Sequence, residues 1–173
     1  MKQLSIIMSS CILSALVFLS CSSPPPEEKE AVSLPDKIIE KFTYTESSGG
    51  EKLWQLFAQK ALVYEEQTHL YGIKVHFYTQ GNISSVLEAR KGKIYPSSGD
   101  MEAEGEVRVE SLQSRETLDA RTLYWDAGRK KILGDDFIRW ETSQTITTGY
   151  GLETDPGLKE VKIQRKVKTV VKE

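Results

Sequence analysis

Polar and apolar residues alternate along much of the chain. From Met101 to Glu110 the odd positions are apolar or small, and the even positions are all charged. A β-strand turns successive side chains to opposite faces, so this pattern predicts a strand with one dry face and one wet face. A second run has the same pattern, with Lys74 and His76 opposite Tyr71, Ile73, Val75 and Phe77. The sequence predicts about a dozen antiparallel strands, as two packed sheets or one rolled, open sheet.

The alternation is organised in a repeat. Three Leu-x-Ala steps, Leu56-Phe57-Ala58, Leu87-Glu88-Ala89 and Leu118-Asp119-Ala120, lie 31 residues apart, and a degenerate fourth step begins at Leu152. Gly72, Gly105 and Gly134 are each followed by a new alternating run. A unit of this length holds roughly two to three strands and is too short for a β-α-β crossover.

One segment of the repeat is ambiguous between helix and strand. Leucines and polar residues between Leu53 and Val63 fit both helical spacing and alternation. The equivalent segments at Leu87 and Leu118 lie among strand-rich sequence, so a strand is favoured. Turn residues separate the predicted strands at 47–51, 96–100, 126–129 and 155–157. The Lys- and Arg-rich segment from Val161 to Lys172 is typical of an edge strand.

The amino-terminal residues do not fit the repeat. Lys2 precedes a short apolar stretch that ends at Leu19-Ser20-Cys21, which resembles the lipobox of a bacterial lipoprotein. We therefore predict a signal peptide at 1–20, and a lipidated Cys21 with a Pro- and Glu-rich tether at 21–35. The folded domain is predicted at 36–173. The alternative is an uncleaved signal anchor.

Composition narrows the function. The chain has 173 residues, 39% of them apolar and 28% charged, with a net charge of −2. This balance argues against a nucleic-acid-binding protein. Cys11 lies within the predicted signal peptide, so the mature chain is expected to contain no disulfide.

The sequence offers little that suggests catalysis. His69 and His76 are seven residues apart, which predicts opposite faces of a continuous strand. No set of residues has the spacing of a metal site, a nucleophile with its base, or a phosphate-binding loop. Glu102, Glu104, Glu106 and Glu110 fit the wet face of one strand. We predict a protein that is not an enzyme and uses no metal or cofactor.

The dry face leaves two interpretations open. Its residues either fill a sandwich core or form the wall of an apolar trough in an incompletely closed sheet. The small alanine in each repeat slightly favours a trough, because large residues fill a core better. A sandwich that binds glycans through Trp54, Trp125 and Trp140 is disfavoured, because these residues lie on strands and not in loops.

A set of motifs in a fixed order resembles a known family. The motifs are Pro35-Asp36, Gly50-x-x-Leu-Trp54-x-Leu56-x-Ala58, Leu70-x-Gly-x-x-Val75-x-Phe77-Tyr78, Leu87-x-Ala89, Gly105-x-Val107-x-Val109, Leu118-x-Ala-x-x-Leu123-x-Trp125-Asp126 and Thr148-Gly149-x-Gly151-Leu152. No single motif is specific, but together they resemble the LptC family of lipopolysaccharide-export proteins, within the LptA/LptC/LptD-type β-jellyroll superfamily.

The resemblance implies a fold and a path for a lipid. The fold is an all-β, V-shaped, antiparallel open jelly roll, whose interior accepts lipopolysaccharide from an ABC transporter of LptB, LptF and LptG and passes it to an LptA-type bridge. The resemblance implies a groove wall of Leu56, Ala58, Val75, Phe77, Leu87, Ala89, Val107, Val109, Leu118, Ala120, Trp125 and Ile138. It implies a partner edge of Gly149, Gly151, Val161, Ile163 and Val167.

The predicted amino terminus departs from the family pattern. Many members keep an uncleaved transmembrane helix, whereas Cys21 here resembles a lipidation site. Ser22 after the cysteine fits a sorting rule that sends lipoproteins to the outer membrane. We expect a periplasmic protein with a lipid anchor, with the inner membrane favoured by the resemblance. The competing interpretation is an envelope scaffold lipoprotein with a filled core that binds only proteins.

Overall fold

The computed structural model describes residues 34–173, and this part of the chain is built from strands. Nine strands are present in it. Their bounds are β1 (Lys37–Ser48), β2 (Glu51–Val63), β3 (Thr68–Thr79), β4 (Asn82–Tyr95), β5 (Asp100–Ser111), β6 (Thr117–Asp126), β7 (Lys131–Glu141), β8 (Thr145–Thr154) and β9 (Val161–Val171). The four predicted turns and the predicted strand from Leu53 to Val63 agree with these bounds.

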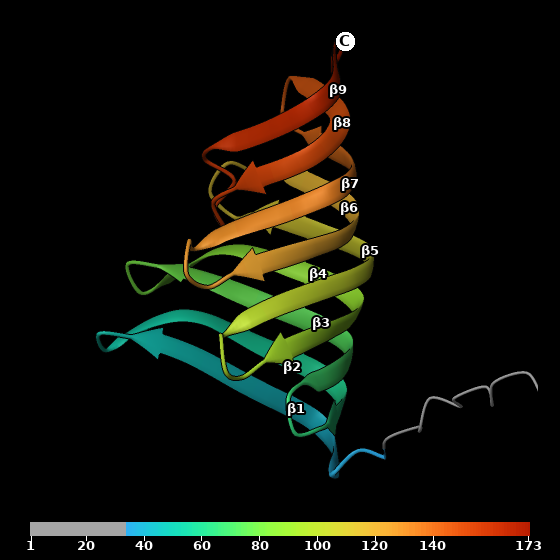
Figure 1. The fold of residues 1–173 in the computed structure, drawn as a ribbon. Coiled ribbons are helices and arrows are strands. Elements are labelled where there is room, and N and C mark those ends of the chain that lie inside the picture. The colour runs from blue at the N-terminus through green and yellow to red at the C-terminus, as the bar shows by residue number, and fades with distance from the viewer. Residues whose placement is uncertain (1–33) are drawn as a thin grey trace, which may run out of the picture. The chain divides into compact units, whose positions relative to one another are not determined.

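The strands form one antiparallel sheet in sequence order, β1 to β9 (Figure 1). Each strand pairs with the strand that follows it, and β1 and β9 are the two edges of the sheet. The prediction of an all-β, open antiparallel jelly roll is confirmed. One 31-residue repeat corresponds to two strands with their turns.

The described part of the chain has nine strands where the sequence predicted about a dozen, because the predicted breaks at glycine lie inside strands. Gly72 and Gly105 have φ angles of +60° and +80° in the middle of β3 and β5. Glycine adopts this left-handed conformation without a steric penalty from a Cβ atom. The chain therefore bends at these residues and continues as the same strand.

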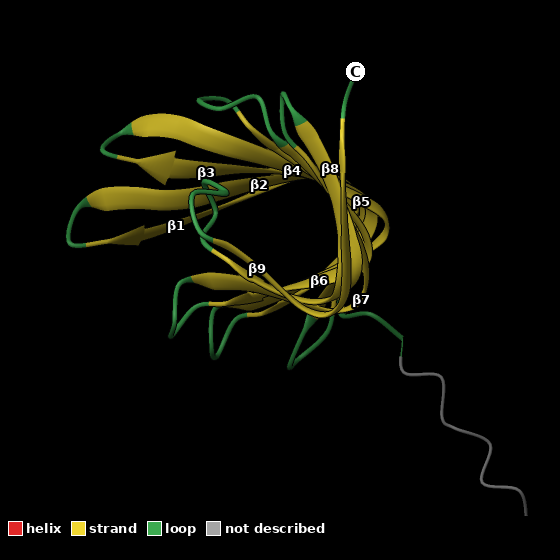
Figure 2. Cartoon of the chain, turned by 90° about the horizontal axis from the view of Figure 1, so that it is seen from above, coloured by secondary structure: helices red, strands yellow, loops and turns green. Residues whose placement is uncertain are grey.

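Similar irregularities cross the whole sheet. Lys41 and Lys166 also have positive φ, and the register shifts at the middle of the β4–β5, β5–β6, β6–β7, β7–β8 and β8–β9 pairs. An extra residue in one strand bends that strand and increases its twist. The aligned bends fold the sheet into two arms that face each other, and on β3 the residues before Gly72 belong to one arm and those after it to the other. Figure 2 shows the strands curving around a common axis, with hairpin ends diverging on one side.

The bend also changes which residues of a strand face inward. On β3, Leu70 and Ile73 are both buried, although they are three residues apart. Gly72 between them lies at the bend and interrupts the alternation. The prediction that Tyr71 shares the dry face with Ile73 is wrong for this reason, and Tyr71 is exposed at 37%.

The predicted signal peptide at 1–20 and the lipidation site Cys21 lie outside the described residues, as does nearly all of the tether at 21–35. The first strand of the described domain begins at Lys37. Residues 34–173 include no helix with the length and apolarity needed to cross a membrane.

Candidate functional site

The leucines of the repeat form one inward row across the sheet. Each residue in this row is the register partner of the next, from β2 to β6: Leu56, Val75, Leu87, Val109 and Leu118. All five are 5% exposed or less. Complete burial of such a side chain stabilises the fold by about 1.5–3 kcal/mol. The repeat therefore places one leucine of a continuous apolar surface on every second strand.

A second inward row lies beside the bend and alternates between small and large residues. Its register-linked parts are Ala58–Ile73–Ala89 and Val107–Ala120–Ile138–Gly149. The two arms converge at the bend, so little room is left for side chains there. A small residue beside a large one fills such a narrow angle without a gap. The bend accounts for the alanines that the sequence analysis connected with a trough.

The structure brings all twelve predicted wall residues to the inner surface. Ala89 and Ala120 are half-buried and pack against the core, and the other ten are buried: Leu56, Ala58, Val75, Phe77, Leu87, Val107, Val109, Leu118, Trp125 and Ile138.

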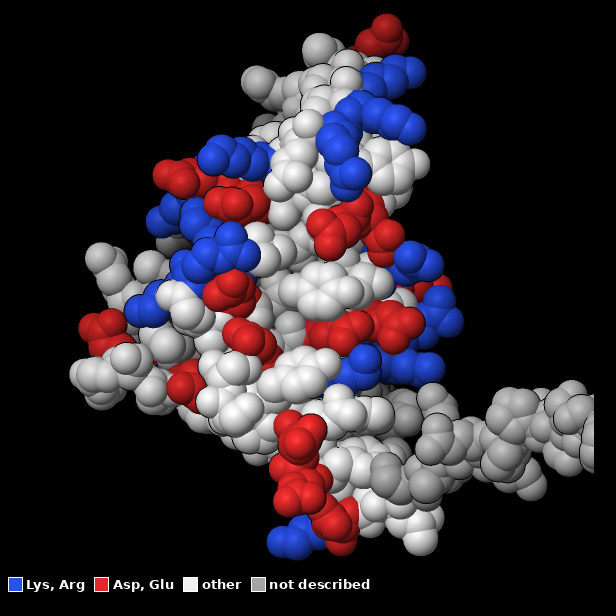
Figure 3. Space-filling model, in the orientation of Figure 1, with Lys and Arg blue, Asp and Glu red and all other residues white. Residues whose placement is uncertain are grey.

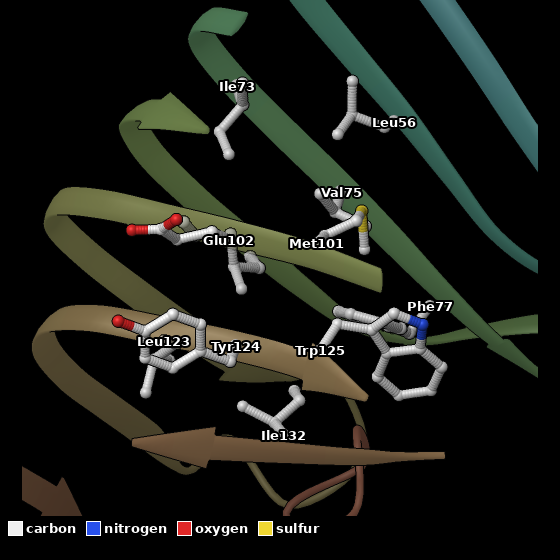
Figure 4. Close-up of a pocket in the computed structure, with 12 residues that line it drawn as sticks. Leu56, Ile73, Val75, Phe77, Met101, Glu102, Leu123, Tyr124, Trp125 and Ile132 are labelled. Atoms are coloured by element: carbon white, nitrogen blue, oxygen red, sulfur yellow. The ribbon is translucent and has the colours of Figure 1, made fainter. Parts of the chain in front are cut away.

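Aromatic side chains line the interior near the hairpin ends. Phe77 on β3 and Trp125 on β6 come from opposite arms, and their ring centroids are 5.3 Å apart (Figure 4). Trp54 is the register partner of Phe77 and is stacked on Tyr44, also at 5.3 Å. Burial raises the pKa of Tyr44, as does the nearby carboxylate of Glu46, which accepts a hydrogen bond from the Tyr44 hydroxyl at 3.2 Å.

Between the arms is a small apolar cavity of about 20 Å³. This is room for about one water molecule. Figure 4 shows side chains from both arms around it. Ile73, Met101, Leu123 and Ile132 line the cavity but were absent from the predicted wall. Alternation would have found Ile73 and Met101, since Ile73 is two residues before Val75 and Met101 begins the clearest alternating run.

The outer surface carries cross-strand ion pairs. Lys74 pairs with Glu88 at 2.7 Å and Arg90 with Glu106 at 2.6 Å. Figure 3 shows basic and acidic side chains interleaved on the visible side of the molecule. Glu102 also lies on this surface, where its hydrogen bond with Lys93 at 3.0 Å raises the pKa of Lys93. The exposed Glu104 and Glu106 agree with the prediction that the β5 glutamates are solvated charges, whereas the side chain of Glu102 is only 17% exposed.

Both histidines lie on the outer surface. Their neighbours Leu70 and Phe77 point inward, so His69 and His76 face outward together. The prediction of opposite faces is wrong because the bend at Gly72 interrupts the alternation between them. Burial lowers the pKa of His76, and the nearby Lys74 lowers it further. Within residues 34–173 no three His, Cys, Asp or Glu side chains are grouped as metal ligands.

Residues 4–172 match the family described as lipopolysaccharide-assembly, LptC-related. The chain belongs to the LptC family. Family membership confirms the resemblance seen in the motifs and implies a role in lipopolysaccharide transport in the cell envelope. A search of curated proteins gave no match.

The predicted partner edge of this LptC-family chain is divided between two strands. Val161, Ile163 and Val167 lie on the edge strand β9, where Val167 is 54% exposed. Gly149 and Gly151 lie on β8, one strand in from the edge, and both are buried. A Cβ atom on Gly149 would approach the Ile163 Cγ2 atom to 2.5 Å and the Arg165 carbonyl oxygen to 2.8 Å. Gly149 therefore allows β9 to lie close against β8.

The edge strand is basic. Between Val161 and Val171 it carries Lys162, Arg165, Lys166 and Lys168 and no acidic residue. Its inward positions are aliphatic, as the half-buried Val161 and Ile163 show. The backbone edge of β9 that faces away from β8 has no strand partner among the described residues. The prediction of a Lys- and Arg-rich edge strand agrees with this position.

Proposed function

We propose that this LptC-family protein conveys lipopolysaccharide through the interior of its folded sheet. It accepts the lipid from an ABC transporter of the LptB, LptF and LptG type and passes it to an LptA-type bridge protein. The single observation that supports this most is the apolar row from Leu56 to Leu118, which crosses successive strands without a polar interruption. The twelve wall residues described above are the proposed lipid contacts.

The energetics favour such a path. An acyl chain is stabilised by about 25 cal/mol for each Å² of apolar surface that leaves water. A continuous apolar row lets the acyl chain advance from strand to strand without losing this stabilisation. The cavity of about 20 Å³ is far smaller than an acyl chain, so the lipid enters only when the two arms separate. The contact between Phe77 and Trp125, which joins the arms, breaks in this step.

The edge strand β9 is the proposed contact with the bridge protein. Its unpaired backbone is suited to β-augmentation, in which a strand of the partner extends the sheet. The exposed Val167 would then be covered, and the apolar interior would continue into the partner. The lysines and Arg165 favour an acidic partner strand.

The proposed location is the periplasm, with a membrane anchor at the amino terminus. Lipidation of Cys21 would supply the anchor, and the family favours the inner membrane. The tether at 21–35 then spaces the domain from the membrane, at about 3 Å per residue where it is extended.

Crosslinking in cells tests the lipid path. A photo-crosslinking amino acid at Leu87 or Val107 is expected to capture lipopolysaccharide. The same group at Glu88 or Arg108 is the matched control, because these residues are next in the chain and face outward. Equal capture at inward and outward positions, or none at either, contradicts the proposal. On depletion of the protein, lipopolysaccharide is expected to accumulate in the inner membrane.

The small cavity favours a second candidate, an envelope scaffold lipoprotein with a filled core that binds only proteins. The crosslinking experiment above separates the two functions, because a filled core gives no capture of lipopolysaccharide at Leu87 or Val107. Ala58→Leu and Ala89→Leu add volume where the two arms converge, so a loss of about 1–3 kcal/mol of stability, measured as a lower unfolding midpoint, is expected for either function.

A further inference from the structure

Four buried side-chain polar atoms among residues 34–173 have no hydrogen-bond partner. One of them, His69 Nε2, belongs to a side chain on the outer surface. The other three lie inside the fold and are the indole Nε1 atoms of Trp54 and Trp125 and the hydroxyl of Ser85. Trp54 and Ser85 are both 0% exposed, and Trp125 is 7% exposed. Buried donors are nearly always paired, so each unpaired group in a native interior calls for an explanation.

The three residues that carry these groups are all neighbours of Phe77. Trp54 on β2 and Ser85 on β4 are its register partners on either side. The Trp125 ring comes from the opposite arm and lies 5.3 Å from the Phe77 ring (Figure 4). We call Trp54, Phe77, Ser85 and Trp125 the Phe77 cluster. It combines an apolar wall with hydrogen-bonding groups from both arms.

Other polar groups of the sheet do find partners. The Ser84 hydroxyl donates to the Phe77 carbonyl oxygen at 3.2 Å, and the Thr147 and Thr169 hydroxyls are 3.0 Å apart. The third tryptophan, Trp140, donates through Nε1 to Glu116 Oε2 at 3.3 Å. Among residues 34–173, three of the four buried unpartnered side-chain atoms therefore belong to the Phe77 cluster, and the fourth is His69 Nε2.

The chemistry of the cluster selects an uncharged acceptor. Indole supplies N–H donors without charge, whereas a phosphate or carboxylate is bound best by cations. Glu46 is the register partner of Trp54 on β1, so its carboxylate lies in line with the Phe77 cluster. This negative charge repels an anion. A carbonyl oxygen carried on an apolar chain satisfies both the donors and the apolar wall.

We propose that the Phe77 cluster is a binding site for the ester or amide carbonyl of an acyl chain in the interior. This inference rests on the proposed function, because it assumes that the interior opens to lipids. The indole N–H groups of Trp54 and Trp125 and the Ser85 hydroxyl hold the carbonyl oxygen, and Phe77 packs against the first methylenes. The site distinguishes acyl-linked lipids from alkyl-linked ones of equal length.

Two neutral detergents provide the test. Sucrose monododecanoate carries an ester carbonyl, and dodecyl maltoside has the same chain length and a disaccharide head but no carbonyl. We expect the wild-type protein to bind the ester about five-fold more tightly, as one net hydrogen bond of about 1 kcal/mol gives. Binding is measured below micelle concentrations by titration of ¹⁵N-labelled indole resonances, in which Trp54 and Trp125 shift and Trp140 does not.

Single substitutions test which groups produce the preference for the ester. Trp54→Phe, Trp125→Phe and Ser85→Ala each remove one group and are expected to reduce the preference for the ester, whereas the control Trp140→Phe keeps it. Because Trp→Phe leaves space in the core, the same tryptophans are also replaced by benzothienylalanine, which keeps the shape of indole but has no N–H. Loss of preference in this isosteric protein assigns the effect to the hydrogen bond.

The outcomes separate this inference from the function on which it rests. Equal affinity for the two detergents overturns the carbonyl site and leaves the lipid path intact. The site is also overturned if the indole N–H groups of Trp54 and Trp125 contact bound water and their resonances do not shift when the ester binds. If neither detergent binds, the interior does not take lipids, and the carbonyl site and the lipid path both fail.

Discussion

The inner and outer surfaces of the sheet are made by the same strands but are held in different ways. Leu118 and Ile138 on the inner surface are 0% exposed, whereas the side chains of the outer pair Arg90 and Glu106 are 65% and 74% exposed. Buried apolar side chains stabilise a fold by about 1.5–3 kcal/mol each, and exposed ion pairs by about 0–1 kcal/mol. The inner surface therefore determines stability, and the outer surface is free to serve solubility and association.

The largest expected effect is at the centre of the inner row. Leu118→Ala removes a side chain enclosed on all sides and is expected to lower the free energy of unfolding by about 2–5 kcal/mol. Denaturant unfolding measures this loss, with Arg90→Ala on the outer surface as the control. A loss below about 1 kcal/mol would place Leu118 beside open space and break the contrast between the surfaces.

A smaller effect is expected where β9 approaches β8. The new methyl group of Gly149→Ala meets Ile163 and the Arg165 backbone, and strain of about 1–3 kcal/mol is expected. Amide hydrogen exchange should show β9 loosening first. Gly128→Ala is the control, since its added atom lies 3.5 Å from the nearest neighbour. Unchanged amide exchange in β9 of the Gly149→Ala protein would show that β8 and β9 move apart without a loss of stability.

A third effect depends on pH and acts at the carboxyl end of β9. Hydrogen bonds from Lys172 and then Arg139 lower the pKa of Glu141 from its ordinary value of 4.5. A lowered pKa in the folded state contributes stability above the ordinary value, and this stability is lost as the pH falls through the lowered one. The Lys172 amide donates to the Gln144 carbonyl oxygen, and its protection factor, the exchange rate corrected for the intrinsic effect of pH, should fall in acid. In Glu141→Gln this fall in protection should be lost, and a fall that persists would assign the effect to another group.

The smallest effect is expected on the outer surface. A double-mutant cycle of Arg90→Ala and Glu106→Ala should give a coupling energy below about 1 kcal/mol, which declines with added salt. A larger coupling that resists salt would mean that the outer surface also stabilises the bend, and the contrast with the inner surface would weaken.

Alternation and the repeat predicted most of the fold and twelve residues of the inner surface, but the predicted wall lacked Ile73, Met101, Leu123 and Ile132. They failed where the backbone leaves the extended conformation. At Gly72 the alternation is interrupted, so Tyr71 and the two histidines were placed wrongly. A pattern of period two contains no information about such an irregularity, and a glycine is equally compatible with a turn between strands. The Phe77–Trp125 contact was also beyond prediction, because it joins opposite arms that no local pattern relates.

The order β1 to β9 has a consequence for how the protein forms after export. Because every strand pairs with its immediate neighbours in sequence, no contact in the ladder waits for a distant part of the chain. Sheets with local connections fold faster than those with long crossovers, and stacked repeats grow by adding units to an existing end. One further unit of two strands would lengthen the sheet by about 9–10 Å and leave both edges unchanged. The length of the sheet across its strands is thus set by the number of repeats.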